Sequence, residues 1–259
     1  MVAVDRPLTP PLLRAESAPL TAHLRKEFRD GRALTFALDV AVEVPPGFTI
    51  LFGPSGAGKS TLLDCLAGLT SPGAGRIAVG ERVLFDSSAH VNLAPQKRRV
   101  AYVFQSLALF PHLTVEENVA YGLGHLPLAE RRARARGVLD SFRAGHVLAR
   151  RPGEISGGER QRAALARSLV TDPQILLLDE PLSALDEELR AGIVEDLRRW
   201  NAARQLPVVY VTHSREEARS LGERLIALDA GSVVAQGAPQ DILARISARD
   251  GTGRAVRKT

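Results

Sequence analysis

A glycine-rich loop at residues 53–60 constrains this chain more than any other feature. The loop reads GPSGAGKS, follows the apolar run 48–52 and precedes an apolar stretch from about 59 to 69. Glycine lets the backbone curl so that successive N–H groups point at an anion, and a following helix aims the positive end of its dipole at the same place. This order of strand, loop and helix argues against an incidental glycine turn. The sequence therefore predicts a site for the terminal phosphates of a nucleotide.

Two residues of the loop and two at the end of another apolar run supply the expected chemistry. Lys59 would reach the β and γ phosphates, and the Ser60 hydroxyl would hold Mg²⁺. The run 175–178 ends in Asp179 and Glu180, as when a buried strand delivers acids to the ligand edge of a sheet. Asp179 would support Mg²⁺, and Glu180 would polarise the attacking water as a general base. Alone, these acids also fit a solvated strand end; the glycine-rich loop favours the catalytic interpretation.

Apolar runs separated by helix-length stretches indicate the fold class. An alternating outer strand is expected over about 33–44, and the candidate buried strands are 48–52, 100–104, 175–178, 208–211 and 225–228. Strands and helices in alternation predict a mainly parallel α/β sheet. The stretch of about 106–165 breaks this rhythm and predicts a helical insertion, with an Arg-rich amphipathic run at 129–143. Proline-rich residues 1–20 predict a flexible leader, and residues 246–259 form a basic tail.

Composition excludes several classes of protein. The 259 residues are 45% hydrophobic, as in a globular chain with a real core, and Cys65 is the single cysteine, so no internal disulfide or thiolate zinc cluster is available. No signal peptide and no apolar window of membrane-spanning length is found, which predicts a cytoplasmic protein. The net charge of +5 is scattered among acids, a pattern typical of a solvated surface and not of a nucleic-acid site.

A further segment carries a family resemblance. Residues 155–162, ISGGERQR, resemble the signature motif of ABC-family ATPases. In the family's order, Gln105 resembles the Q-loop glutamine, residues 183–186 the D-loop and His213 the switch histidine. The resemblance covers roughly residues 24–243. Two positions depart from the commonest signature: Ile155 stands where Leu is usual, and Glu159 where Gln is usual.

The resemblance implies a fold, a mechanism and a set of site residues. The fold would be a phosphate-loop NTPase (RecA-like) core with an antiparallel β subdomain and a helical subdomain, together spanning 21–245. Two copies would clamp ATP and Mg²⁺ head to tail as a homodimer. The catalytic residues would be Glu180, His213 and Lys59, and the metal ligands Ser60, Gln105 and Asp179. The nucleotide would be contacted by Gly53, Pro54, Ser55, Gly56, Ala57, Gly58, Lys59, Ser60, Thr61, Gln105, Ser156, Gly157, Gly158, Glu159 and Asp186.

Two further elements are assigned by the same resemblance. An aromatic residue usually stacks on adenine, and Phe28 is the first candidate for this role, with Phe36 as the alternative; either also fits a core position. The apolar residues of 104–115 resemble the groove that receives a coupling helix of a membrane subunit, although internal packing explains such residues too.

The resemblance also narrows the transported solute. The segments 93–105 and 109–115 resemble importer ATPases for oxyanions, polyamines, iron and sugars, and 80–86 is most similar to molybdate importers. This implies transmembrane permease subunits, a solute-binding protein and a position on the inner face of the membrane. The alternatives are a polyamine, iron or sulfate importer, or a soluble ABC ATPase, which normally has two cassettes or a long coiled coil. A regulatory nucleotide-binding module would lack Glu180 or His213.

Overall fold

The computed structural model describes residues 18–31 and 33–252. These form two compact units: the sheet unit contains 18–105, 174–183 and 206–252, and the helical unit contains 106–173 and 184–205. Most of the predicted leader, residues 1–17, lies outside the described residues, as do residues 253–259 of the predicted basic tail. The first strand begins at Leu20, and residues 246–252 continue the last helix.

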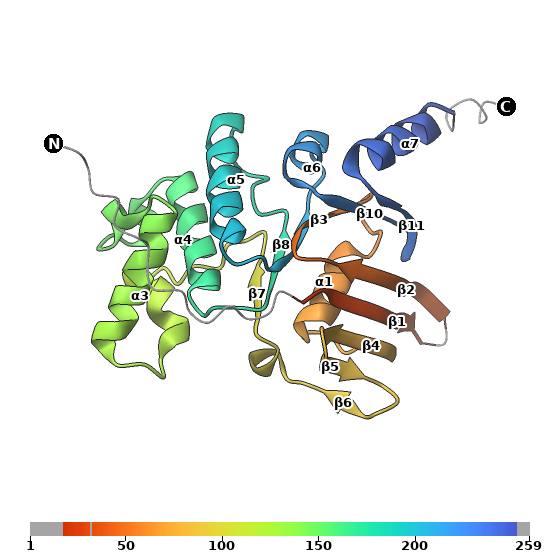
Figure 1. Cartoon of the computed structure of the whole chain (residues 1–259), viewed down its shortest axis with the longest axis horizontal. Helices are drawn as coiled ribbons and strands as arrows, with labels where there is room; N and C mark the ends of the chain where they lie inside the picture. The colour runs from red at the N-terminus through yellow and green to blue at the C-terminus, as the bar shows by residue number, and fades with distance from the viewer. Residues whose placement is uncertain (1–17, 32, 253–259) are drawn as a thin grey trace. The chain divides into compact units, whose positions relative to one another are not determined.

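The described part of the sheet unit is built on one 11-stranded sheet with the order β6-β5-β4-β1-β2-β11-β10-β3-β9-β8-β7 (Figure 1). The strands are β1 Leu20–Asp30, β2 Ala33–Val44, β3 Gly47–Phe52, β4 Ala74–Val79, β5 Arg82–Asp86, β6 Val91–Asn92, β7 Val100–Val103, β8 Ile175–Asp179, β9 Pro207–Val211, β10 Arg224–Asp229 and β11 Ser232–Gly237. Every apolar run predicted to be a buried strand is a strand of this sheet.

The five strands β10, β3, β9, β8 and β7 pair in parallel, with their carboxyl ends at one edge. Helix α1 (Lys59–Ala67) covers one face, where Leu62 and Leu63 join the core with Leu51 and Val209. On the other face, Ile50 approaches Gly222, which ends α6 (Arg215–Leu221). Helix α7 (Pro239–Thr252) follows β11. Because both faces are covered, these strands read as continuous apolar runs.

Strands β1, β2, β4, β5 and β6 form the antiparallel half of the sheet, and β11 joins this half to β10 by pairing with β2 in parallel. The hairpin β1–β2 pairs Leu20 with Val44, and β4, β5 and β6 continue outward from β1 (Figure 1). Alternate residues of β2 from Leu38 to Val44 are buried while those between are exposed, the pattern of a sheet with one face on the core. This half corresponds to the antiparallel β subdomain that the family resemblance implied; the periodicity alone had placed only β2.

The helical unit has its own core. Its helices are α2 Val115–Ala120, α3 Leu128–Ser141, α4 Gly157–Leu169 and α5 Glu187–Ala202. Val119, Leu139 and Ala163, from three of these helices, are fully buried together. Helix α2 begins with a capping box in which Thr114 accepts the N–H of Glu117 and the Glu117 carboxylate accepts that of Thr114, satisfying amide groups that the first helical turn leaves unpaired. Across the described ranges, the helices are too short or too polar to cross a membrane.

Candidate nucleotide site

The loop between β3 and α1 adopts the conformation that its glycines permit. Gly53, Gly56 and Gly58 all have positive φ, at 156°, 80° and 99°. A methyl group on Gly53 would clash with the Leu228 carbonyl oxygen, and one on Gly58 would lie 2.8 Å from the Phe36 ring. Nothing lies within 4 Å of the same position on Gly56, so at Gly56 it is backbone conformation and not crowding that requires glycine. The loop conformation thus depends on glycine at all three positions, through positive φ at each and through crowding at Gly53 and Gly58.

Lys59 is the first residue of α1 and is 7% exposed. Its Nζ donates to the carbonyl oxygens of Gly53 and Pro54, both at 2.9 Å, so the side chain folds back over the loop. Desolvation lowers the pKa of Lys59, while the carboxylates of Glu180 and Asp179 oppose that shift. The Lys59 ammonium therefore lies over the glycine loop and near the carboxylates of Glu180 and Asp179. A charged amine at this place is suited to bind phosphate.

Asp179 ends β8 and forms a cluster with two residues that the sequence did not single out. The Tyr102 hydroxyl on β7 lies 3.3 Å from Asp64 Oδ1 and 3.5 Å from Asp179 Oδ2. Asp64 follows Ser60 by four residues on α1 and therefore lies on the same helix face. Desolvation raises the pKa of Asp64, and the nearby Asp179 raises it further, while the Tyr102 hydrogen bond lowers it. The i, i+4 spacing from Ser60 is the sequence signal that would have found Asp64.

Glu180 follows Asp179 in an unusual backbone conformation. Its φ is +46°, a region that residues with a side chain rarely adopt and that costs about 1–3 kcal/mol. Its N–H donates to the Val211 carbonyl at 3.2 Å, and its own carbonyl accepts from the Ser183 hydroxyl. Glu180 Oε1 lies 2.7 Å from Nε2 of His213, two residues beyond β9. The neighbouring strands β8 and β9 thus deliver a paired carboxylate and imidazole.

The strand order brings four predicted site segments to one sheet edge. Reading β3, β9, β8 and β7 in turn, the carboxyl ends lead into the glycine loop, His213, Asp179–Glu180 and Gln105. Gln105 is exposed, two residues past β7. Parallel sheets place ligand sites at this edge, so the topology alone gathers these segments into one candidate site.

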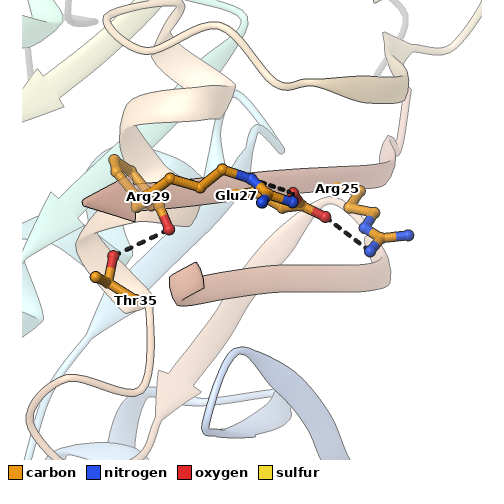
Figure 2. A network of polar contacts seen from close by, with 5 residues as sticks. Arg25, Glu27, Arg29 and Thr35 are labelled. Atoms are coloured by element: carbon orange, nitrogen blue, oxygen red, sulfur yellow. Dashed lines mark hydrogen bonds and ion pairs between the residues drawn. The ribbon is translucent and has the colours of Figure 1, made fainter. Parts of the chain in front are cut away.

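The two aromatic candidates lie on adjoining strands. Phe28 on β1 is 39% exposed, its ring centroid lies 6.2 Å from that of Phe36 on β2, and Lys26 Nζ lies 5.4 Å from the Phe28 centroid. Figure 2 shows Glu27 between Arg25 and Arg29 on β1, and the Thr35 hydroxyl donating to the Phe28 carbonyl. Phe36 is the ring that approaches Gly58. Phe36 therefore adjoins the start of α1, while Phe28 contacts Phe36 from the neighbouring strand and is the more accessible of the two.

The predicted signature residues lie in the helical unit. Ser156 is the N-cap of α4, its hydroxyl accepts the N–H of Glu159, and Gly157 and Gly158 form the first turn. Leu185 and Leu189 lie 3.5–3.7 Å from the positions that methyl groups on Gly157 and Gly158 would take. Asp186 caps α5 by accepting the Leu189 N–H at 2.9 Å. The signature and the D-loop residue Asp186 thus begin two helices of the same unit.

The residues at the sheet edge fit a nucleotide and Mg²⁺. Ser60 and Asp179 offer hydroxyl and carboxylate oxygens, the donors that Mg²⁺ prefers, and Mg²⁺ is usually held by one or two carboxylates together with substrate phosphates. Among the described residues, no group of three or more His, Cys, Asp or Glu side chains could hold a metal ion alone. The hydroxyl of Ser60 and the carboxylate of Asp179 suit a Mg²⁺ ion that is bound together with phosphate.

The glycine loop on β3, the acids on β8 and the histidine on β9 define a protein of the phosphate-loop class. The sequence profile of the ABC transporter family matches residues 38–183. The chain belongs to the ABC transporter family.

Individual relatives agree with this assignment. The molybdenum import ATP-binding protein ModC of Rhodospirillum rubrum is 43% identical over 208 residues, 80% of this chain and 56% of the relative. ModC 1 of Azotobacter vinelandii is 43% identical over 224 residues, 86% of this chain and 62% of the relative. A dimeric structure of MJ0796, a bacterial ABC transporter cassette, is 31% identical with a TM-score of 0.72 and covers 85% of this chain and 98% of that one. The chain thus spans about three fifths of the curated relatives' length.

Proposed function

We propose that the chain is the ATP-binding and ATP-hydrolysing subunit of an ABC importer. The contact between Glu180 Oε1 and His213 Nε2, at 2.7 Å on strands next to the glycine loop, is the observation that carries this proposal. A module that only binds nucleotide needs neither a strained carboxylate nor its imidazole partner at this edge. Strain of this kind persists where the surrounding structure enforces it for function.

The side chains at the sheet edge have distinct roles in the proposed reaction. The loop amides and the Lys59 ammonium bind the phosphates. Ser60, Asp179 and Gln105 would hold Mg²⁺, which would supply positive charge to neutralise the transferring phosphoryl group. Glu180 accepts a proton from the attacking water, and His213 holds the carboxylate and donates toward the phosphoryl oxygens. Phe28 stacks on the base. The observations that support these roles are the hydrogen bonds of Lys59 and the pairing of Glu180 with His213.

The complete site requires two copies of the chain. Ser156, Gly157, Gly158 and Glu159 begin a helix whose dipole favours an anion at this end, and Asp186 begins the next helix of the same unit. We propose that they face the γ phosphate held by a second copy, so that ATP joins a homodimer and hydrolysis releases it. The relative of known structure is described as dimeric.

The proposed solute is molybdate or a related oxyanion. The support is the printed function of the ModC relatives and the extent of their match. Permease subunits would hold the chain at the inner face of the membrane, with a solute-binding protein outside. A deletion strain should lose uptake of labelled molybdate and regain it with the wild-type gene but not with Glu180→Gln. Loss of sulfate, iron or polyamine uptake instead would reassign the solute.

The catalytic proposal is tested with Glu180→Gln in the purified chain. The substitution keeps the shape and the contact with His213 but removes the base, so hydrolysis should fall by about 10²-fold or more. ATP should still bind, and ATP with Mg²⁺ should convert the monomer to a stable dimer in sedimentation experiments. Hydrolysis at the wild-type rate would show that Glu180 is not the base.

A further inference from the structure

A short chain of side chains leads from the signature to an exposed histidine. Glu159 Oε2 accepts the Ser156 N–H at 2.8 Å and the Ser156 hydroxyl at 2.7 Å. Its other oxygen, Oε1, lies 2.8 Å from Nε2 of His146. His146 belongs to the 3₁₀ turn Gly145–Val147, and its side chain is 64% exposed, whereas that of Glu159 is 23% exposed. All three residues lie in the helical unit.

The direction of these hydrogen bonds follows from the charge of Glu159. The Ser156 N–H and hydroxyl, with His146, hold the pKa of Glu159 at about 2, so near neutral pH the side chain is a carboxylate and can only accept. His146 Nε2 must therefore carry a proton. The Ser156 hydroxyl proton points at the carboxylate, and the same hydroxyl oxygen accepts the Glu159 N–H.

Neighbouring charged groups are engaged elsewhere. Arg160, next along α4, donates to the Ile155 carbonyl at 3.0 Å. Glu154 accepts the Arg151 N–H. Asp140, at the end of α3, has its Oδ1 against Gly145. The charge within hydrogen-bond distance of Glu159 is accordingly set by His146, and histidine is the side chain that ordinarily changes charge between about pH 5 and pH 8.

We propose that His146 is a positioning residue that adjusts the ATP-driven association of two copies of this chain by neutralising Glu159 beside Ser156. The proposal rests on the proposed function, in which Ser156 meets the γ phosphate of a second copy. A bare carboxylate beside Ser156 would repel that phosphate and retain the hydroxyl proton. A charged His146 imidazole at Glu159 Oε1 cancels the repulsion between Glu159 and the phosphate. It also makes the carboxylate a weaker hydrogen-bond acceptor, so the Ser156 hydroxyl can turn toward the phosphate. Association should therefore be tighter at lower pH.

The test measures the ATP concentration at which half of the chain is dimeric, by sedimentation in the Glu180→Gln background at about pH 6 and about pH 8. Four proteins complete a cycle: the background, and the background with His146→Gln, with Glu159→Gln or with both. His125→Gln, an exposed histidine of the same unit, is the matched control. His213 is present in every variant, so its contribution is the same in each and cancels in the comparison.

The background and the His125→Gln control should need about threefold less ATP at the lower pH, as an exposed ion pair permits. His146→Gln should make this pH dependence smaller than in the background and the control, because more ATP is then needed for dimerisation at low pH. Once Glu159→Gln is in place, adding His146→Gln should change nothing. If His146→Gln shifts the midpoint equally with and without the Glu159→Gln substitution, or if its pH dependence is as large as that of the background, His146 does not act through Glu159. Absence of any ATP-dependent dimer would overturn the proposed function itself, and this inference with it.

Discussion

Glu180 Oε1 lies 2.7 Å from His213 Nε2, at the carboxyl ends of two neighbouring parallel strands. The strained φ of Glu180, +46°, is held from both sides, because its N–H is bonded to Val211 and its carbonyl to Ser183. The backbone hydrogen bonds thus fix the main chain of Glu180, and the His213 imidazole fixes the position of its carboxylate. Two residues 33 positions apart (213 − 180) form one unit through sheet pairing.

Removal of His213 should therefore impair hydrolysis more than nucleotide binding. In His213→Ala the carboxylate loses its partner while the glycine loop and Lys59 are untouched, so kcat should fall by about 10²-fold. The Kd for ATP should change by less than about threefold, because the contacts of the glycine loop and Lys59 with ATP are retained. His23→Ala, an exposed histidine on β1, should behave as wild type. A larger loss in ATP binding than in kcat would place His213 in binding and not in catalysis.

Gly58→Ala should destabilise the chain more than Gly56→Ala. Both residues have positive φ, at 99° and 80°, so both substitutions strain the backbone. Only at Gly58 would the new methyl group also meet protein atoms, 2.8 Å from Phe36 Cζ and 3.0 Å from Leu38 Cδ1. Overpacking should add about 1 kcal/mol to the loss in unfolding free energy, measured by urea denaturation. Equal losses for the two variants would mean that the Phe36 ring moves aside freely.

The parts of the site that local sequence encodes were predictable. The glycine loop fixes its own conformation through glycine φ values, and the apolar run ending in Asp179 and Glu180 predicts a buried strand, whose catalytic interpretation depended on the glycine loop. The contact between Glu180 and His213 was not predictable from these patterns, because it depends on β8 lying next to β9. The same holds for Tyr102 with Asp179, and for His146 with Glu159, which are joined by tertiary packing.

The antiparallel strands show a second limit of predicting structure from sequence. β6 has two residues, and β4 and β5 have six and five, too short for a clear period of two. Their register depends on β1, whose outer residues Glu27, Arg29 and Asp30 are charged and resemble a loop composition. Apart from β2, which its alternating pattern predicted, only the family resemblance pointed to this half of the sheet.

Arg98 shows how an ordinary charge run can contain a structural residue. Lys97, Arg98 and Arg99 look alike in sequence, yet Arg98 is fully buried while its neighbours are more accessible. Its guanidinium donates to the carbonyls of Cys65, Leu66 and Leu93 and to Asn92 Oδ1, at 2.7–2.9 Å. Arg98 thereby caps the carboxyl-terminal end of α1, the helix that follows the glycine loop. A cation at this end also interacts favourably with the helix dipole.

Arg98→Met should consequently lower the free energy of unfolding by about 3 kcal/mol, because two buried and two partly buried hydrogen bonds lose their charged donor. Lys97→Met, at the exposed neighbouring position, should change it by less than about 0.5 kcal/mol. Chemical denaturation followed by circular dichroism measures both values. A loss for Arg98→Met as small as that of the control would show that water replaces the guanidinium at the end of α1.

Cys65 should be inert in the folded chain and reactive on unfolding. It lies on α1 and is fully buried, and desolvation raises the pKa of the thiol to about 11. At about pH 8 the thiolate fraction is on the order of one in a thousand, against about a quarter for an unperturbed thiol. Because Cys65 is the single cysteine, labelling by a thiol-specific reagent reports one site. Native protein should label slowly, urea-unfolded protein at once, and Arg98→Met faster than wild type, since it loosens the end of α1. Rapid labelling of the native wild-type chain would contradict the burial of α1 against the sheet.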